Sequence, residues 1–358
     1  MSDSLKTTLY NHHDELGAKL VPFAGFLMPL QYTGIIDEHK HVRSKVGLFD
    51  VSHMGEFIVS GDNAKKFLQN VTINDIELLK PGKAQYSAFC NESGGILDDL
   101  LIYDLSDHYM LVVNASNIQK NFNWLQNRLF DNVVLKDVSN DMGLLAIQGP
   151  MARDILKDFF PKIESLKYYE TLMPNSDGTI VARTGYSGEL GFEIYISNDK
   201  IIDLWNKLLI ASDFIRPVGL GCRDSLRLEM GYCLYGHELD ESINPIEAGL
   251  SWITKFDTGF IGSESLSNLK IEKKLVPLVL KDRAIPRADY KIFDDNDKEI
   301  GFISSGAMSP SLGYGIALAY IDMPYAKDLN SFNVKIRNNI FTINKAKLPF
   351  YKDGTYLK

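Results

Sequence analysis

The sequence is poor in cysteine, and it lacks long apolar runs. Its 358 residues include only three cysteines, Cys90, Cys222 and Cys233. An odd number of widely spaced cysteines does not make a disulfide framework, so we expect a reducing compartment, by default the cytoplasm. No apolar run reaches the length of a membrane span, so we expect no membrane association. The first ten residues, MSDSLKTTLY, lack the apolar core of a secretory signal, so we expect no cleaved leader.

Positive charge is also scarce. The chain has 38 Lys and Arg residues against 46 Asp and Glu residues, which gives a net charge of −8. General nucleic-acid binders usually present a basic field, so this composition argues against nucleic acid as a partner. An anionic ligand would need a local basic pocket.

Metal and nucleotide motifs are missing from the sequence. The seven histidines lack companion cysteine or carboxylate residues at metal-ligand spacing, so we expect no metal site. The Gly-x-Gly at 219–221 is too short for a dinucleotide fingerprint, and no phosphate loop of the GxxxxGK type occurs. Among the histidines, only His53 stays open as a site residue.

What the chain does have is a mixture of helix and strand periodicities, which indicates an α+β fold. It is too long for one core, so we expect two or three structural units. A strand, a helix, a hairpin and a second helix recur twice, as in a duplicated ferredoxin-like split βαβ unit. The expected first unit has strands at 54–60, 86–90, 96–103 and 109–113 and helices at 62–71 and 116–129. The expected second unit has strands at 144–148, 179–183 and 191–196 and helices at 151–160 and 199–211.

The C-terminal part has a different pattern. After a helix expected near 223–231 and a charged connector, short alternating segments begin at LVPLVL and continue with turn residues between them. This pattern predicts a small all-β, barrel-like domain. We therefore divide the chain into residues 1–275, the two α+β units, and 276–358, the C-terminal domain.

The segment NESGGILDDLLIY places two adjacent carboxylates, Asp98 and Asp99, in an otherwise apolar strand. Because successive side chains of a strand point to opposite faces, Asp98 shares a side with Ile96 and Leu100, while Asp99 shares one with Leu97. Both sides are apolar, so at least one carboxylate needs a partner or a function, unless both lie half exposed beside the turn.

Three further segments have the composition of ligand-binding loops. DVSHMGEF packs polar residues ahead of a strand, although a simple Asx or Ser turn would also explain it. RTGYSGELGFE surrounds Tyr186 with glycines and puts Glu193 on an apolar strand, as a plain glycine-rich hairpin with a surface tyrosine also could. VGLGCRDSLRLE places Arg223 and Arg227 one helical turn apart, so each requires an acidic or anionic partner, with Asp224 and Glu229 as structural possibilities.

These segments, in this order and with SGAMSPSLGYGIALAY behind them, resemble the aminomethyltransferase or T-protein family of the glycine cleavage system. The resemblance covers nearly the whole chain. It implies two folate-binding α+β units and a C-terminal β-domain. It also implies transfer of the methylene carbon of an aminomethyl group from the lipoyl arm of H-protein to tetrahydrofolate, with release of ammonia.

The resemblance also implies roles for individual residues. The catalytic carboxylate is assigned to Asp99, with Asp98 as the second candidate. Arg287, in a looser motif, matches a position that faces the lipoyl-carrying partner, and a role for Tyr356 stays doubtful. The implied folate contacts are Met54, Tyr86, Asn114, Tyr186, Glu193 and Arg223.

The residue types suit this chemistry. A carboxylate such as Glu193 can accept adjacent N–H groups of a pterin ring, and an arginine such as Arg223 suits the anionic glutamate tail of folate. Tetrahydrofolate is then the co-substrate, lipoylated H-protein the partner, and the expected assembly a monomer without metal.

Two alternatives stay open at this point. One is a folate-dependent demethylase of small N-methyl or S-methyl compounds. The other is a non-catalytic folate-binding accessory protein, for which a cysteine-containing loop at 231–238 would be typical, and Cys233 lies there.

Overall fold

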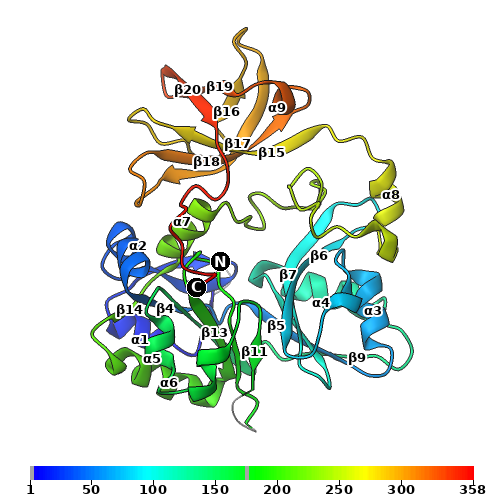
Figure 1. Cartoon of the computed structure of the whole chain (residues 1–358), viewed down its shortest axis with the longest axis vertical. Coiled ribbons are helices and arrows are strands. Elements are labelled where there is room, and N and C mark those ends of the chain that lie inside the picture. The colour runs from blue at the N-terminus through cyan, green and yellow to red at the C-terminus, as the bar shows by residue number, and fades with distance from the viewer. Residues whose placement is uncertain (1–3, 174–176) are drawn as a thin grey trace.

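The computed structural model describes residues 4–173 and 177–358. It has three lobes, with two α/β lobes side by side and a β-barrel above them (Figure 1). In the part of the chain that is described, no helix is both long and apolar enough to cross a membrane.

The N-terminal segment precedes both α/β lobes and was not predicted in detail. It forms a small sheet of order β1-β3-β2. Its elements are β1 (Leu5–Lys6), α1 (Tyr10–Glu15), β2 (Lys19–Phe23), β3 (Phe26–Gln31) and α2 (Ile35–Ser44).

The first unit has the predicted ferredoxin-like order. Its strands line up as β6-β7-β8-β5-β9, with antiparallel neighbours throughout, so β5, β7, β8 and β9 make the split βαβ motif and β6 adds an edge. The elements are β5 (Gly55–Ser60), α3 (Ala64–Val71), β6 (Lys83–Cys90), β7 (Ile96–Asp104), β8 (Tyr109–Val113), α4 (Ile118–Gln126) and β9 (Val134–Asp137).

The second unit repeats this order with one insertion. Strand β4 precedes the first unit in sequence, yet it lies between β10 and β14 in the second sheet, whose order is β11-β12-β13-β10-β4-β14. All five of its residues are buried, as a central strand requires. The elements are β4 (Val46–Asp50), β10 (Met142–Gln148), α5 (Ala152–Leu156), β11 (Thr171–Leu172), β12 (Ile180–Ala182), β13 (Gly191–Ser197), α6 (Asn198–Ala211) and β14 (Ile215–Pro217).

Helix α5 is shorter than the predicted helix at 151–160. Pro161 disfavours the α conformation at the residue before it, and Phe160 indeed lies at φ −135° and ψ 78°. A short 3₁₀ turn, Pro161–Ser165, follows.

Helix α7 (Leu220–Met230) and a long loop lead from the second unit to α8 (Ser263–Asn268) and the barrel. The barrel closes in the order β15-β18-β17-β16-β19-β20, as predicted for the C-terminal part. The division at residues 275 and 276 stays a prediction, and the first barrel strand runs across it. The elements are β15 (Lys273–Leu280), β16 (Lys291–Phe293), β17 (Glu299–Met308), β18 (Gly315–Asp322), α9 (Tyr325–Asp328), β19 (Ser331–Ile336) and β20 (Asn339–Lys345).

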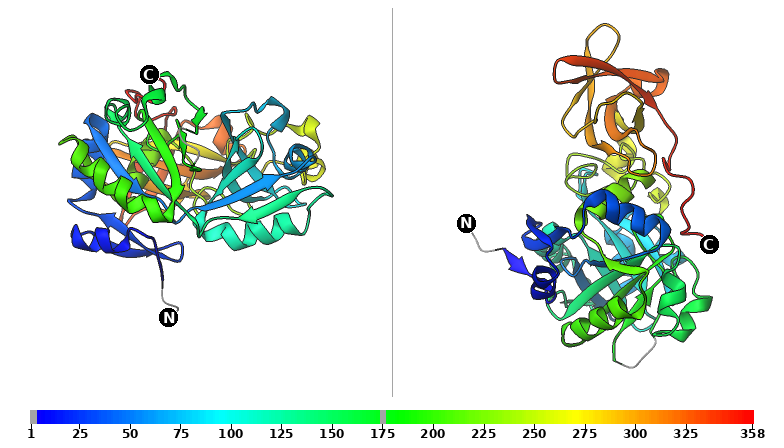
Figure 2. Two further views of the ribbon diagram at one scale, coloured as in Figure 1. Left: turned by 90° about the horizontal axis from the view of Figure 1, so that it is seen from below. Right: turned by 90° about the vertical axis from the view of Figure 1, so that its left-hand side faces the viewer.

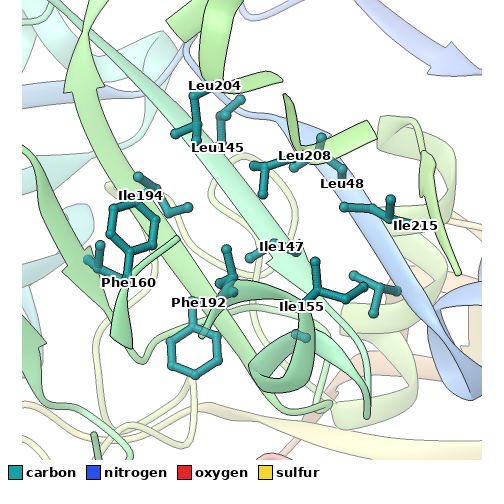
Figure 3. Close-up of a cluster of buried hydrophobic side chains, with 14 of the residues drawn as sticks. Leu48, Leu145, Ile147, Ile155, Phe160, Phe192, Ile194, Leu204, Leu208 and Ile215 are labelled. Atoms are coloured by element: carbon teal, nitrogen blue, oxygen red, sulfur yellow. The ribbon is translucent and has the colours of Figure 1, made fainter. Parts of the chain in front are cut away.

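Each of the two sheets contributes apolar side chains to a core on either of its faces. Along β10, Leu145 and Ile147 pack toward α5 and α6 in the core of the second unit (Figure 3), while Leu144 and Ala146 join a second core shared with the first unit. This shared core also contains residues of α7. Side chains that point from either sheet toward the shared core therefore meet between the units.

The chain end crosses back over the lobes. After β20 it runs down from the barrel beside the second unit, so that the C-terminus lies near that lobe (Figures 1 and 2). The Arg183 side chain donates hydrogen bonds to the carbonyls of Tyr356 and Lys358, and Thr355 Oγ1 bonds Glu189 at 2.6 Å. These contacts hold the terminal segment against the second unit.

Candidate functional site

A cavity of about 1290 Å³ lies where the two units, α7, the loop after it and the barrel meet. Single-ligand pockets usually measure roughly 300–1,000 Å³, so this one has room for more than one substrate. The cavity is lined by all eight residues that the sequence assigned to the site, namely Met54, Tyr86, Asp99, Asn114, Tyr186, Glu193, Arg223 and Arg287.

The two aspartates of β7 have different surroundings. Asp98 is fully buried on the side of α4, where it accepts hydrogen bonds from the side-chain amides of Asn114 (2.8 Å), Asn117 (2.7 Å) and Asn121 (2.5 Å). The backbone N–H of Asn114 adds a fourth bond at 3.1 Å. Asp98 therefore has a complete set of hydrogen-bond donors from the protein, and its role is structural.

Asp99 instead lines the cavity and is only partly enclosed. Its Oδ2 accepts the Tyr86 hydroxyl at 2.9 Å, and its Oδ1 accepts Asn114 Nδ2 at 2.8 Å. Burial raises the pKa of both aspartates, and the charge of Asp99 raises that of Asp98 further. Asp99 keeps acceptor capacity for a ligand, because two protein donors do not use all its lone pairs.

A bulge in β7 changes two neighbours that the alternation predicted, Leu97 and Ile96. Phe89 pairs with Asp98 and Cys90 with Ile96, so Leu97 is left unpaired. Leu97 consequently joins the core of the first unit with Leu100, on the side of Asp98. The prediction that Leu97 shares a face with Asp99 was wrong for this reason. The prediction that Ile96 shares one with Asp98 was wrong too, because Ile96 packs with Ala88 and Cys90, on the side of Asp99.

Two flat tyrosine faces form part of the wall. Tyr86 stacks on Trp252 with ring centres 6.2 Å apart. Tyr186 stacks on Tyr232 at 5.7 Å, and its hydroxyl donates to the Cys233 carbonyl. The cavity can thus receive a planar ligand between aromatic surfaces.

The two arginines of α7 differ in their partners. Arg227 is almost fully buried and pairs with Glu238 and Asp224, each at 2.9 Å. Glu229, one of the two acidic residues considered as partners, binds His39 and Arg43 instead.

Arg223 lies over the ring of Tyr186 at 4.6 Å, and none of the described residues offers it a hydrogen-bond acceptor or an ion pair within bonding distance. Burial lowers the pKa of its guanidinium, and the charge of Glu193 acts in the opposite direction. An unpaired cation facing a cavity is a natural site for a ligand acceptor.

Glu193 lies on β13 and points toward the first unit, because its neighbours Phe192 and Ile194 point into the core of the second unit. Its Oε2 accepts the Thr184 hydroxyl at 2.5 Å. Its Oε1 makes no hydrogen bond within the described residues and stays available to a ligand.

Met54 and His53 complete the wall beside β5. Met54 packs against the shared core. His53 is buried, and burial, with Arg223 nearby, lowers its pKa to about 4, so the ring is neutral at neutral pH. Its Nδ1 finds no partner in the described part of the chain.

Arg287 lies in the loop between β15 and β16, is exposed, and lines the cavity from the barrel side. The sequence missed several other residues of the wall, notably Trp252, Tyr232 and Tyr235. These residues lie in the irregular stretch after α7, where no periodic pattern indicates which side chains turn inward.

The comparisons with known proteins agree with this geometry. The family model "GCVT N-terminal domain" matches residues 9–258, and the model "Glycine cleavage T-protein C-terminal barrel domain" matches residues 273–352. An aminomethyltransferase of Flavobacterium psychrophilum is 46% identical over 97% of this chain and 99% of its own. One of Chloroherpeton thalassium is 49% identical over 96% and 98%.

A solved structure shows the same fold. The glycine cleavage system aminomethyltransferase T from Bartonella henselae superposes with a TM-score of 0.94 at 34% identity, over 99% of this chain and 100% of the other. Fold, cavity and full-length relatives together define the class of the protein as an aminomethyltransferase, an enzyme. The chain belongs to the glycine cleavage T-protein family.

The surroundings of the two aspartates predict effects of different size on stability. Asp98→Asn should lower the free energy of unfolding by about 3 kcal/mol, because it sets an amide donor against buried amide donors. Asp99→Asn, the matched control, should change it by less than about 1 kcal/mol, since Asp99 faces the cavity. Urea unfolding of both variants measures this, and equal losses would contradict the assignment of Asp98 to the structural role.

Proposed function

We propose that the chain transfers the methylene carbon of an aminomethyl group, carried on the lipoyl arm of H-protein, to tetrahydrofolate. The reaction gives 5,10-methylenetetrahydrofolate and releases ammonia. Family membership supports this proposal, and so does a cavity large enough for a folate and a second substrate. We propose a cytoplasmic monomer as the working form. Nothing in the geometry or among the relatives named above favours the demethylase or the accessory protein.

One observation carries the proposal. Most buried charges of this region have protein partners, but Asp99, Glu193 and Arg223 keep unused bonding capacity and line the same cavity. Unused charged groups in one concave site indicate a polar ligand of mixed character. Tetrahydrofolate has that character, with N–H donors and a carbonyl on one ring and a carboxylate tail.

The ring end of folate fits Glu193. The free Oε1 can accept pterin N–H groups, and Tyr186 with Met54 offers flat and apolar contacts. Because the charge of Glu193 acts on Arg223, the two side chains serve neighbouring parts of the cavity. We therefore propose that Arg223 binds the ring carbonyl, rather than the glutamate tail to which the sequence assigned it.

Asp99 fits the chemical step. As ammonia leaves the aminomethyl carbon, positive charge develops there, and a carboxylate beside it stabilises that charge. Two new bonds, to N5 and N10 of tetrahydrofolate, replace the bonds from carbon to the amine and to sulfur. The two folate N–H protons leave with ammonia and with the lipoyl thiol, and Asp99 can relay one of them because burial raises its pKa. Tyr86 and Asn114 hold Asp99 in place.

The lipoyl arm needs a route to Asp99. Arg287 is exposed on the barrel side of the cavity wall, so we propose that the arm of H-protein enters past it. An exposed arginine at such an entrance guides encounter and orientation more than it adds affinity.

Substitution of Asp99 tests the chemical role. Asp99→Asn should fold and bind tetrahydrofolate, and its aminomethyl transfer should fall roughly 100-fold, because the neutral amide stabilises developing positive charge poorly. Single-turnover transfer from aminomethyl-loaded H-protein measures this effect. Near-normal turnover in Asp99→Asn would move the catalytic role elsewhere.

Removal of the ring contacts should weaken folate binding. Glu193→Ala and Arg223→Ala should each reduce tetrahydrofolate affinity by roughly 10-fold or more, as loss of a charge-assisted hydrogen bond usually does. Calorimetric titration measures both affinities.

Tetrahydropteroate, which lacks the glutamate tail, serves as the control ligand. If Arg223 binds the pterin ring, Arg223→Ala should lose affinity equally for tetrahydrofolate and tetrahydropteroate. A loss confined to tetrahydrofolate would assign Arg223 to the glutamate tail. Unchanged affinity in both variants would contradict the proposed folate-binding site at Glu193 and Arg223.

Arg287→Ala should slow transfer about three- to tenfold at limiting H-protein and leave tetrahydrofolate affinity unchanged, because it acts on the encounter. Arg337→Ala is the matched control, since Arg337 is also an exposed barrel arginine but does not line the cavity. Steady-state transfer rates of both variants, measured at varied H-protein concentration, test this prediction. Identical rates for the Arg287 and Arg337 variants would show that the partner docks elsewhere.

A further inference from the structure

Behind Glu193, three buried hydroxyl groups form a continuous chain. Thr184 Oγ1 lies 2.5 Å from Glu193 Oε2 and 3.1 Å from the Tyr103 hydroxyl, which lies 2.9 Å from the Tyr195 hydroxyl. Thr184 is 2% exposed, and both tyrosines are fully buried. Tyr103 and Thr184 lie behind the wall of the cavity, out of reach of a ligand.

The direction of the chain follows from its chemistry. Each hydroxyl has one proton, and an ionised Glu193 only accepts. Thr184 must therefore donate to Glu193, Tyr103 to Thr184, and Tyr195 to Tyr103. All three O–H dipoles point toward the carboxylate, and hydrogen bonds aligned in this way strengthen one another in a buried site.

The chain also crosses between the two units. Thr184, Glu193 and Tyr195 belong to the second unit, and Tyr103 lies on β7 of the first, four residues after Asp99. The Tyr103 and Tyr195 rings meet edge to face at 5.5 Å, which fixes both hydroxyls. The first unit thus takes part in holding a carboxylate of the second.

We infer that Thr184, Tyr103 and Tyr195 are positioning residues for folate recognition, which hold the Glu193 carboxylate in place and fix its Oε1 toward the pterin ring. This inference rests on the proposed function of Glu193. It adds that affinity for tetrahydrofolate depends on two hydroxyl groups behind the cavity wall, those of Thr184 and Tyr103, which the ligand does not touch.

The other ionisable groups around the chain are compatible with this role. Arg223, on α7, and Tyr169 both lie close enough to Glu193 to feel the charge of its carboxylate. Glu56, whose charge would act on Tyr195, is buried without a hydrogen-bond partner in the described part of the chain. Burial raises its pKa well above the ordinary value, which disfavours a charge on Glu56 that would oppose Glu193.

Isosteric substitutions separate this role from packing. Thr184→Val should raise the KM for tetrahydrofolate about tenfold, and Tyr103→Phe about threefold, with kcat nearly unchanged, because they weaken uniform binding. Thr184→Ser keeps the hydroxyl and should retain the affinity of the unmodified chain. Tyr32→Phe removes a hydroxyl that bonds His13 at 2.8 Å outside the chain of hydroxyls, and it is the control for a general loss of stability.

A double-mutant cycle with Glu193→Gln completes the test, with KM and calorimetric affinity measured for each variant. Because the glutamine side chain carries no charge to stabilise, the effects of Thr184→Val and Tyr103→Phe should largely disappear in that background. The same loss in both backgrounds would overturn the inference and indicate packing. Unchanged affinity in Thr184→Val and Tyr103→Phe, while Glu193→Ala still binds weakly, would overturn the inference but leave the proposed folate-binding role of Glu193 in place. If Glu193→Ala itself binds tetrahydrofolate normally, both the proposed folate-binding role of Glu193 and the inference are wrong. Should Thr184→Val not fold, Tyr103→Phe and its cycle decide alone.

Discussion

Compensation of buried charge is the constraint on which this site depends. The two units share an apolar core, so any charged group between them is desolvated and requires partners. Asp98 is satisfied by amides, and Arg227 by Glu238 and Asp224. Asp99, Glu193 and Arg223 are only partly satisfied, and all three line one cavity. The charged groups that keep free bonding capacity and also line the cavity thus mark the ligand.

The duplicated architecture places these groups. Each unit contributes a central strand with one apolar face toward its own helices and a mixed face toward the other unit. Asp99 comes from β7 and Glu193 from β13. Because side chains alternate along a strand, each carboxylate points from its own sheet into the cavity between the units. The barrel and the terminal segment then enclose the space that remains, with Arg287 and Tyr356 in the wall.

Much of this could be predicted from the sequence. The strand and helix order of both units, the barrel and the family follow from periodicity and motifs, and the eight assigned residues line one cavity. Local patterns could not reveal that β4 joins the second sheet, because that pairing spans the whole first unit. Nor could they place the bulge at Leu97, since it depends on the register with β6. The partners of Asp98 and Glu193 come from other elements, and only the fold brings Asn121 and Thr184 to them.

The most direct test of the account is a crystal structure of the chain with tetrahydrofolate bound. We expect the pterin ring to lie against Glu193 and Arg223, with N5 and N10 beside Asp99 and the opening toward Arg287 left for the lipoyl arm. The distance from Glu193 Oε1 to the nearest pterin nitrogen should then lie in the hydrogen-bonding range, about 2.7–3.2 Å. A pterin ring bound away from Glu193, or N5 and N10 turned away from Asp99, would contradict the central claim.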